Sequence, residues 1–423
     1  MKKEWMRLDN AAKIYPLVES EYITTVFRFS ITLDMEIKKD VLLKALNNII
    51  SRFPYYKVTL KKGFFWFYLE ENNKDLKVFE DIKMPCRRMD RVENNGYLFR
   101  VLYINNKISV EFNHILTDGT GGLTFLNTIV YEYLKLEGYE VSVNDWIKDI
   151  KSEVDEQEYE DSHSIIGKKH LKTHNNKVDS IRGVFHLKDR LIKRDQYIVT
   201  YSIMDSNLLY TTAKKFNCSI TVFLTAIYLE SMLEVQKEQI AKKKKRKPIA
   251  IQVPINMRKR LNSVSMRNFS LFIIPYLMPN KDYTFEDIIE YVNQFFKEKT
   301  DINYLLSLMV QNLKTERTPF VRLLPLKLKT VVTPFIYKSV GVDTYSGTIS
   351  NIGRIQLPES IEEHVKRIDF VLGPCPLTKN SCAVSGYKDK IYITFGRNIK
   401  EARVEREFFR KLVKLGVEVQ IEK

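Results

Sequence analysis

The chain has 423 residues, of which 44% are hydrophobic, so it can bury a large core and is long enough for two or three lobes. This composition excludes disorder as the main state. Lys and Arg number 68 against 52 Asp and Glu, giving a net charge of +16. That charge favours an anionic partner, such as nucleic acid, a membrane surface, or a phosphate-bearing small molecule or carrier protein.

The sequence lacks the signals of secretion and of a membrane span. No apolar run follows the charged start "MKKEWMRLDN", and the longest apolar stretches, such as "ITVFLTAIYL", are half of the about 20 residues that a spanning helix needs. The scattered cysteines contain no CxxC pair, which indicates neither disulfides nor a zinc site; they are Cys86, Cys218, Cys375 and Cys382. We therefore expect a soluble, cytoplasmic protein with no bound metal.

The first third of the chain predicts a helix, a hairpin and a strand followed by a second helix. "VLLKALNNIISRFP" (41–54) has apolar residues on one helical face and a proline that ends the helix. "YYKVTLKKGFFWFYLEEN" (55–72) reads as two strands joined around residues 61–63. The stretch "ISVEFNHILTDGTGG" (108–122) begins as a strand, and a helix is predicted from Gly122 to Leu136.

In a strand over residues 108–114, side chains alternate between the two faces of the sheet. Ile108, Val110, Phe112 and His114 then share one face, while Ser109 and the other residues between them take the opposite face. An apolar face is the one that packs on the core. We therefore expect His114 to point inward.

The second half repeats this alternation of strands and helices. Residues 150–190 are charged, polar and weakly periodic, and contain four of the six histidines without metal-ligand spacing. The elements predicted after them are a strand at 197–203, helices at 206–216 and after Ser219, strands at 248–255, 269–278, 344–353, 382–387 and 391–398, the last two joined as a hairpin by 388–390, and a closing helix from Val404 to Leu415. The pattern favours two layered α/β lobes, each a mixed sheet flanked by helices.

The densest positive charge is "KKKKRK" (242–247), which follows an apolar periodic run. We interpret it as a solvated helix end whose cations complement the helix dipole. Nucleic-acid binding would need exposed aromatic residues among the cations, or a known reading module, and the sequence has neither. A nucleic-acid binder is therefore an unfavoured alternative, as is a protein that binds a phospholipid surface.

The three glycines of "GTGG" (119–122) do not form a known phosphate-binding motif. A GxGxxG pattern would need glycine in place of Thr124, and GxxxxGK[ST] is absent from the chain. No GxSxG nucleophile elbow and no local signature of a catalytic cysteine occur either. The remaining candidate for chemistry is His114.

A histidine four residues before an Asp-Gly pair resembles the HxxxDG motif of the chloramphenicol-acetyltransferase-like superfamily, which includes the condensation domains. The resemblance is closest to the alcohol acetyltransferase-like branch and covers nearly the whole chain. Its landmarks occur in the expected order: "WMRLDNAAKIYP", "ALNNIISRFPYYKVTL", "FNHILTDGTGG", "ITVFLTAIYL", "VPINMRKRLNSVSMRNFS" and "TISNIGRIQLP". It implies a two-lobed fold with an active-site channel between the lobes.

The resemblance also implies roles for single residues. His114 matches the general base, Asp118 the aspartate that organises the loop, and Gly119 the small residue that lets the acyl donor approach. Arg258 matches an arginine that pairs with that aspartate. Many condensation domains have a second histidine where this chain has Asn113; because that residue is not the base, the difference does not exclude activity.

An acyl transferase also needs a donor for the oxyanion of its tetrahedral intermediate. The candidates are Ser350 and Asn351, against the alternative that "SNIG" is only a structural crossover. The segment from Asn351 to Gly353 stands where the plant branch has its DFGWG motif, so a role taken from that motif is in doubt.

We thus expect an acyltransferase that moves an acyl group from acyl-CoA, or from a phosphopantetheinyl acyl-carrier protein, to a hydroxyl or amine. No cofactor other than this donor is expected. The predicted division is an N-terminal lobe at 1–175, a connection at 176–195 and a C-terminal lobe at 196–423. A catalytically inactive member of the fold, acting as a binding or regulatory protein, is the alternative.

Overall fold

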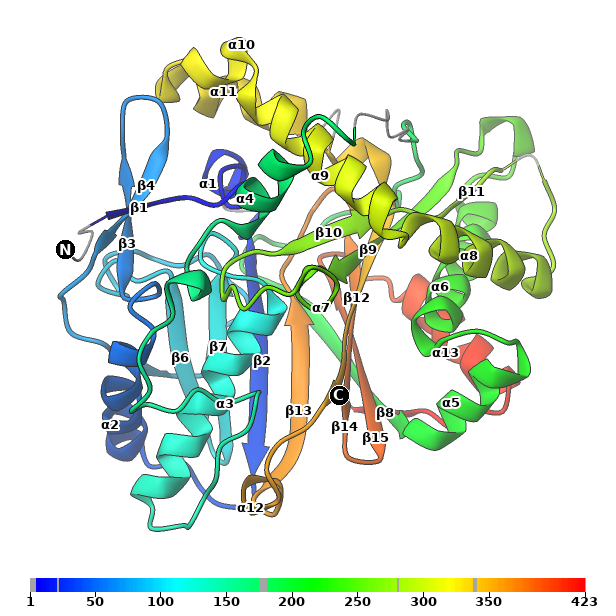
Figure 1. The fold of residues 1–423 in the computed structure, drawn as a ribbon. Coiled ribbons are helices and arrows are strands. Elements are labelled where there is room, and N and C mark those ends of the chain that lie inside the picture. Colours follow the sequence, from blue (N-terminus) through cyan, green and yellow to red (C-terminus); the bar gives the residue numbers. More distant parts are fainter. Residues whose placement is uncertain (1–4, 21–22, 175–180, 280, 338–340, 423) are drawn as a thin grey trace.

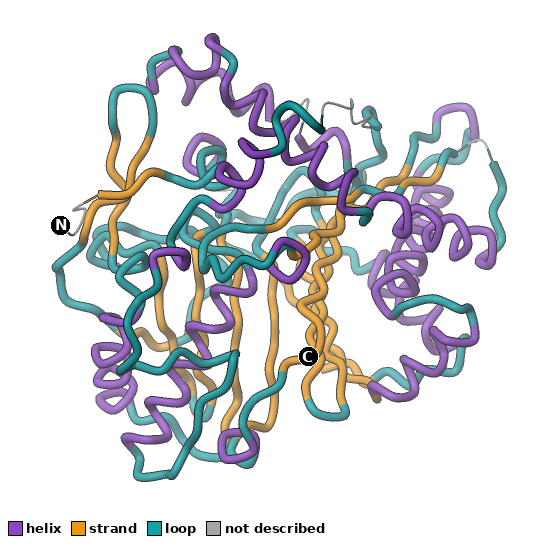
Figure 2. Tube along the Cα trace, viewed as in Figure 1, coloured by secondary structure: helices purple, strands orange, loops and turns teal. Residues whose placement is uncertain are grey.

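A computed structural model describes residues 5–20, 23–174, 181–279, 281–337 and 341–422 (Figure 1). It contains a five-stranded, an eight-stranded and a small three-stranded sheet. The two large sheets stand side by side, with helices gathered on their outer sides (Figure 2). The predicted two-lobed α/β architecture is confirmed.

The five-stranded sheet carries the strand that leads to His114. Its strands in spatial order are β13 (Val365–Leu372), β2 (Val26–Leu33), β7 (Lys107–Asn113), β6 (Phe99–Ile104) and β5 (Val78–Glu80). β2, β7 and β6 pair antiparallel, with Val26 opposite Asn113. Both faces of β7 are buried: Phe112 lies in the apolar core, and Glu111 on the other face bonds to Arg28 and Arg100.

Helices α2 (Lys39–Ile49) and α3 (Gly119–Leu136) belong to this half of the molecule, where α3 packs on β2 and β7. The prediction of α2 is confirmed. The prediction that α3 begins at Gly122 is wrong by three residues, because the helix already starts at Gly119. Because glycine is a poor helix former, a prediction from helix propensity begins α3 after "GTGG". In the structure, packing contacts of these glycines, described below, compensate for their low propensity.

The sequence analysis predicts only β7 in this sheet and does not anticipate β2, β5, β6 or β13. The position of β13 is the least expected. This strand lies within the predicted C-terminal lobe, yet it pairs antiparallel with β2 of the N-terminal half, with Phe370 opposite Phe29. Ser385 Oγ of the second sheet donates to Ile368 O at 3.0 Å. The two large sheets are therefore joined along β13, and periodicity alone does not reveal which sheet a strand enters.

The eight-stranded sheet forms the centre of the other half. Its strands are β10 (Ser270–Ile273), β9 (Ile249–Asn256), β12 (Gly347–Ile355), β14 (Asn380–Tyr387), β15 (Lys390–Arg397), β8 (Ile198–Asp205) and β16 (Gln420–Glu422), with β11 (Tyr276–Leu277) pairing β9 beside β10. The hairpin predicted at 388–390 joins β14 to β15, as expected. The predicted strand at 269–278 is divided into β10 and β11 around Pro275, which has no N–H to donate.

Helices cover the outer face of this sheet (Figure 1). They are α5 (Ser206–Lys215), α6 (Ile220–Gln239), α8 (Phe285–Lys299) and α13 (Arg403–Lys414). The predictions of α5, α6 and α13 are confirmed. Ser219 begins α6 by accepting a hydrogen bond from Val222 N at 3.2 Å, as an N-cap serine does.

The remaining elements lie around the two sheets. The small sheet consists of β1 (Trp5–Arg7), β4 (Phe67–Glu71) and β3 (Val58–Lys62), and contains the predicted hairpin. The other helices are α1 (Tyr15–Val18), α4 (Ser162–Lys169), α7 (Arg258–Leu261), α9 (Ile302–Arg317), α10 (Pro319–Leu323), α11 (Leu326–Ile336) and α12 (Glu359–Glu362). α10, α11 and the β3–β4 hairpin stand together at one end of the molecule (Figure 1).

The predicted connection at 176–195 lies partly outside the described residues, which omit 175–180. From Val184 to Leu187 the chain enters the core of the second half. The charged tract before it is more ordered than its composition indicates, since it forms α4 and buries Glu158 under Arg52.

The lysines of the lysine-rich segment are exposed, as predicted, and Arg246 Nε donates to the carbonyl of Ile240, the C-cap residue of α6, at 3.0 Å. No single helix in the described residues is long and apolar enough to be a membrane span. Only α5 and α6 taken together, with a bend of 77° between them, have that length and composition.

Candidate active site

His114 lies one residue beyond the end of β7, where the chain leaves the five-stranded sheet. Its backbone N–H donates to Thr25 O at 2.8 Å, continuing the ladder with β2 for one more residue. The next residues turn, with Leu116 N donating to Asn113 O at 3.0 Å. The imidazole is therefore carried by a rigid strand end instead of a free loop.

The imidazole lies between two aromatic rings and an amide. Tyr15 of α1 stacks on it at a centroid distance of 5.1 Å, and Phe27 of β2 lies 4.6 Å away on a tilted plane. His114 Nδ1 is 3.4 Å from Asn268 Oδ1. The same amide donates from Nδ2 to His114 O at 2.8 Å, so Asn268 holds both the backbone and the ring of the histidine.

These surroundings favour a neutral imidazole. Burial lowers the pKa of His114 from its ordinary value, because the ring has little water to solvate a positive charge. The Asp118 carboxylate, the Asn268 hydrogen bond and the backbone of Thr117 act in the opposite direction without restoring the ordinary value. At neutral pH the histidine is therefore ready to accept a proton.

Asp118 is held in a buried ion pair with Arg258. Its two oxygens accept hydrogen bonds from both terminal nitrogens of Arg258, each at 2.9 Å, and Oδ2 also accepts Phe269 N at 2.9 Å. Arg258 in turn donates to Ser265 O at 2.7 Å and to Arg267 O at 2.6 Å. The carboxylate thus fastens the motif loop to the 265–269 segment.

A second set of hydrogen bonds between the loop after His114 and the 265–269 segment explains why residue 121 is glycine. Thr117 Oγ1 and Tyr56 OH both donate to Met266 O, at 2.6 and 2.7 Å. A Cβ atom on Gly121 would lie 2.1 Å from that threonine oxygen, 2.4 Å from Met266 O and 2.5 Å from the tyrosine oxygen. Only glycine fits here, so this residue serves close packing and not phosphate binding.

Gly119 faces the second half of the molecule. A Cβ atom there would lie 3.1 Å from Ile352 Cδ1. Because side chains alternate along a strand, Ser350 shares the face of β12 that carries Ile352. Its half-buried hydroxyl makes no hydrogen bond within the described residues.

Asn351 points to the opposite face of β12. Its Nδ2 donates to Thr221 Oγ1 of α6 at 3.0 Å, and its Oδ1 accepts Gly353 N at 2.8 Å. Gly353 has φ +82 and lies where the pairing of β12 with β14 shifts register, which is a β-bulge. Both ends of the Asn351 amide are thus used in supporting this bulge.

The structure adds three residues that the sequence analysis does not assign: Asn268, Tyr15 and Asp9. Asp9 is fully buried, accepts Asn268 Nδ2 at 3.2 Å and lies 3.5 Å from Arg267 Nε. Burial raises the pKa of Asp9 to about 6, although Arg267 opposes the shift. All three additions lie in "WMRLDNAAKIYP" or "SMRNFS", stretches of the landmarks that carry the family resemblance.

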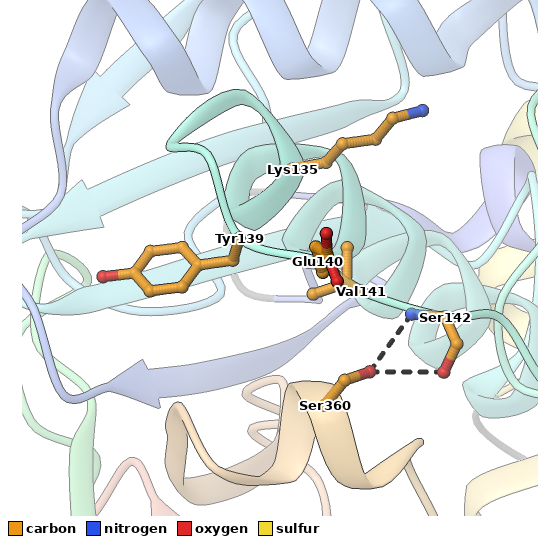
Figure 3. Close-up of a pocket in the computed structure, with 6 residues that line it drawn as sticks. All are labelled: Lys135, Tyr139, Glu140, Val141, Ser142 and Ser360. Atoms are coloured by element: carbon orange, nitrogen blue, oxygen red, sulfur yellow. Dashed lines mark hydrogen bonds between the residues drawn. The ribbon is translucent and has the colours of Figure 1, made fainter.

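A surface hollow lies far from this constellation. It is bounded by the end of α3 and by Ser360 of α12, whose Oγ accepts Ser142 N at 3.1 Å (Figure 3). Lys135 in its wall is about 24 Å along α3 from Gly119, at about 1.5 Å per residue. Within the described residues no group of three or more His, Cys, Asp and Glu side chains is arranged to hold a metal ion.

No protein-family model matches the sequence, and no curated protein matches it significantly. Solved structures match it over nearly its full length. TRI101 of F. graminearum, solved with coenzyme A and deoxynivalenol, has a TM-score of 0.65 and 8% identity, with 99% of each chain covered. Polyketide synthase associated protein 5 from Mycobacterium tuberculosis has a TM-score of 0.62 and 13% identity, covering 98% of this chain and 99% of that one.

A third similar structure is the starter condensation domain of rhizomide synthetase, as a mutant solved with C8-CoA and Leu-SNAC. Its TM-score is 0.59 at 11% identity, with 97% of this chain and 94% of that chain covered. At such identities the likeness concerns the fold. The chain therefore has the two-lobed chloramphenicol-acetyltransferase-like fold, which condensation domains and the trichothecene 15-O-acetyltransferase TRI3 also have.

Proposed function

We propose that the protein is an acyltransferase that moves an acyl group from a thioester donor to a hydroxyl or amine acceptor, with His114 as the general base. The observation that carries the proposal is the imidazole itself: it is neutral by environment, held at the end of a rigid strand, and oriented by Asn268. The similar structures solved with coenzyme A or C8-CoA support a thioester donor.

The hydrogen bonds of Asn268 favour one tautomer of His114. Asn268 Nδ2 already donates to two oxygens, so Oδ1 is the acceptor that faces the ring. His114 Nδ1 then carries the proton, and Nε2 has the free lone pair. The separation of 3.4 Å is long for a hydrogen bond, as is common before substrate binds.

In the proposed reaction Nε2 takes the proton of the acceptor hydroxyl or amine as that atom attacks the thioester carbonyl. The tetrahedral intermediate then collapses, the carbon–sulfur bond breaks, and the imidazolium returns the proton to the departing thiolate. One residue serves both steps, which suits a group whose pKa lies near the working pH. The products are the acylated acceptor and the free thiol.

Asp118 is proposed as a structural residue and not as a proton carrier, because both of its oxygens are occupied by Arg258 and Phe269 N. For the oxyanion we propose the hydroxyl of Ser350 over Asn351, whose amide is already engaged on the opposite face of the strand. Donor and acceptor would enter a channel between the lobes from opposite sides and meet at His114.

Coenzyme A and a phosphopantetheinyl carrier are both compatible with the net charge of +16. The test is mass spectrometry of products after the purified protein is offered acyl-CoA thioesters and acyl-carrier proteins with mixed alcohols and amines. Product formation that falls by about 10² to 10⁴-fold in His114→Ala, with melting unchanged, supports the base. Full turnover in that variant refutes its role.

Absence of any product across the panel, together with unchanged cellular function of His114→Ala, would instead identify an inactive member of the fold. Asn268→Ala is the matched variant for the positioning of the ring. It should lower kcat more than it raises KM, because it keeps the imidazole but removes the amide that orients the ring and supports the His114 carbonyl.

A further inference from the structure

Helix α11 carries an apolar stripe that faces solvent. Its exposed side chains are spaced at i, i+3, i+4 and i+7, and are Leu328, Val331, Val332 and Phe335. This spacing places them on one side of a helix, the side that an amphipathic helix of a globular protein usually turns to the core. Phe335 is 74% exposed. The helix therefore turns four apolar side chains to solvent, although Leu326 at its start is buried in the core.

A buried lysine on the inward side of α11 holds the helix in this orientation. Lys329, on the inward side of the same helix, is 3% exposed and donates from Nζ to Phe65 O at 2.8 Å. The ammonium also stands 3.5 Å from the centre of the Trp66 ring, a cation–π contact. Burial lowers the pKa of Lys329 to about 8. Because the charged residue is anchored inside, the apolar stripe is held outward.

The tip of the β3–β4 hairpin extends this stripe. Leu326 N donates to Phe64 O at 2.8 Å, which joins the start of α11 to the hairpin. Phe64 is 72% exposed, and Phe65 is also exposed beside it. We define the α11 surface as Phe64, Phe65, Leu323, Leu328, Val331, Val332 and Phe335. It stands at one end of the molecule, where the hairpin meets α10 and α11 (Figure 1).

The charge around the α11 surface is positive. Residues 318–337 contain three cations and no Asp or Glu. Arg322 and Lys327 are exposed, as is Lys62 at the end of β3, whereas the neighbouring Lys61 is paired with Glu70 at 3.1 Å. An apolar surface edged by cations has the composition of an interfacial helix that lies in an anionic bilayer.

We propose that the α11 surface docks the protein on bilayers that contain anionic phospholipids, with the apolar stripe and the hairpin tip inserted at the boundary between headgroups and acyl chains. A second copy of the chain is a poorer occupant, because a two-fold contact would bring the same cations together without carboxylates to pair them. A site on the projecting end of the molecule also suits a flat lipid surface.

The position of this surface brings a bilayer close to the site described above. α11 packs against α1, and Tyr15 of α1 stacks on the imidazole of His114. The docking itself does not depend on acyl transfer, so it is measured without an activity assay.

The experiment is co-sedimentation of the full-length protein with vesicles of phosphatidylcholine, with and without phosphatidylserine. We expect binding to the phosphatidylserine vesicles, weaker binding as salt is raised, and little binding to phosphatidylcholine alone. A Phe64→Trp variant should show a blue shift of its emission on binding, because the hairpin tip leaves water.

The decisive variant is Val331→Asp/Phe335→Asp, which places two carboxylates on the stripe and should weaken vesicle binding by at least about tenfold. The matched control is Ile82→Asp/Val92→Asp. It introduces the same charges at two exposed apolar residues outside the α11 surface and should bind within about twofold of the wild-type protein after allowing for its net charge. Unchanged melting of both variants shows that folding is retained.

The proposal is overturned if the protein does not sediment with anionic vesicles, or if both double variants bind them equally. It is also overturned if the stripe variant retains vesicle binding but loses self-association in sedimentation velocity, a result that would assign the surface to a second copy of the chain. Retained vesicle binding with loss of binding to an acidic acyl-carrier protein would overturn it as well, and would assign the surface to a protein partner.

Discussion

The pairing of Asp118 with Arg258 permits a quantitative test by a double-mutant cycle. The two side chains are 8% and 10% exposed and form a two-pronged ion pair. Replacing either one by alanine leaves the other charge in a place from which water is largely excluded. Such a loss typically costs about 3 to 5 kcal/mol of unfolding free energy.

The double variant removes both charges and leaves only neutral backbone groups without their partners: the N–H of Phe269 and the carbonyls of Ser265 and Arg267. Each unsatisfied group costs about 1 to 3 kcal/mol, less where water enters the space. Since water can enter the space that both side chains vacate, we take the low end for these three groups and expect a total loss of about 3 to 4 kcal/mol, against a sum of about 6 to 10 kcal/mol for the two single variants. The coupling should be at least about 2 kcal/mol.

Hydrogen exchange at the Phe269 amide measures this stability locally, since that amide donates directly to Asp118. Chemical unfolding followed by fluorescence gives the global value for the same four proteins. The comparison pair is Arg52–Glu158, also two-pronged and buried. Because the Glu158 carboxylate also accepts hydrogen bonds from Lys148 Nζ and Tyr55 OH, it keeps partners when Arg52 is removed, and its cycle should show a smaller coupling than that of Asp118 and Arg258.

Additive losses of stability in the first cycle would refute this reasoning. They would mean that the guanidinium and the carboxylate do not meet in solution. The loop that holds the imidazole would then require another fastening, and the role of Arg258 proposed from the ion pair would have to be withdrawn.

Three further predictions concern the site itself. Because burial lowers the pKa of His114 below 6.5, the neutral base persists to lower pH, and kcat/KM should rise with pH to a plateau through a midpoint below 6.5. Asn268→Asp should stabilise the imidazolium and move this midpoint to higher pH. An unchanged midpoint would exclude contact between the two residues. Gly121→Ala, whose Cβ would meet oxygens at 2.1 to 2.5 Å, should destabilise the protein by at least about 2 kcal/mol. Gly119→Ala should melt near wild type, because its Cβ would meet the end of the flexible Ile352 side chain at 3.1 Å and Phe29 only at an ordinary contact distance of 3.7 Å. Equal melting temperatures of the two variants would contradict the packing described here. Ser350→Ala should lower kcat by about 10² to 10³-fold if its hydroxyl stabilises the oxyanion, and retained turnover would eliminate it.

The elements of this fold were predictable where their side chains repeat with the period of the element. α2, α6 and the hairpin between β14 and β15 follow that rule. The start of α3 did not follow it, because three glycines with weak helix propensity are stabilised there by contacts that lie far away in sequence. β13 was missed for a related reason: its pairing with β2 joins residues more than 330 positions apart, with Phe370 opposite Phe29.

The residues of the candidate site also divide into those that a local sequence pattern reveals and those that only contacts distant in sequence bring together. The histidine and the aspartate of the motif are four residues apart, so a local pattern reveals them. Asn268 and Asp9 have no local signature, since an asparagine beside an arginine, or an aspartate near the start of a chain, is common on any protein surface. Only the fold brings them to His114, and only burial then gives their polar groups a defined partner.

Within the first half of the chain, His114 contacts Thr25 O, Tyr15 and Phe27. The hydrogen bonds that orient its ring and fix the loop after it cross from one half of the chain to the other. Asn268 meets His114, Arg258 meets Asp118, and Met266 O meets Thr117, at sequence separations of 140 to 154 residues. The strand end that carries the imidazole belongs to the first half, and the groups that orient it belong to the second. The site is therefore complete only when the two lobes are docked, and β13, which joins both sheets, stabilises that docking through backbone pairing independent of the site residues.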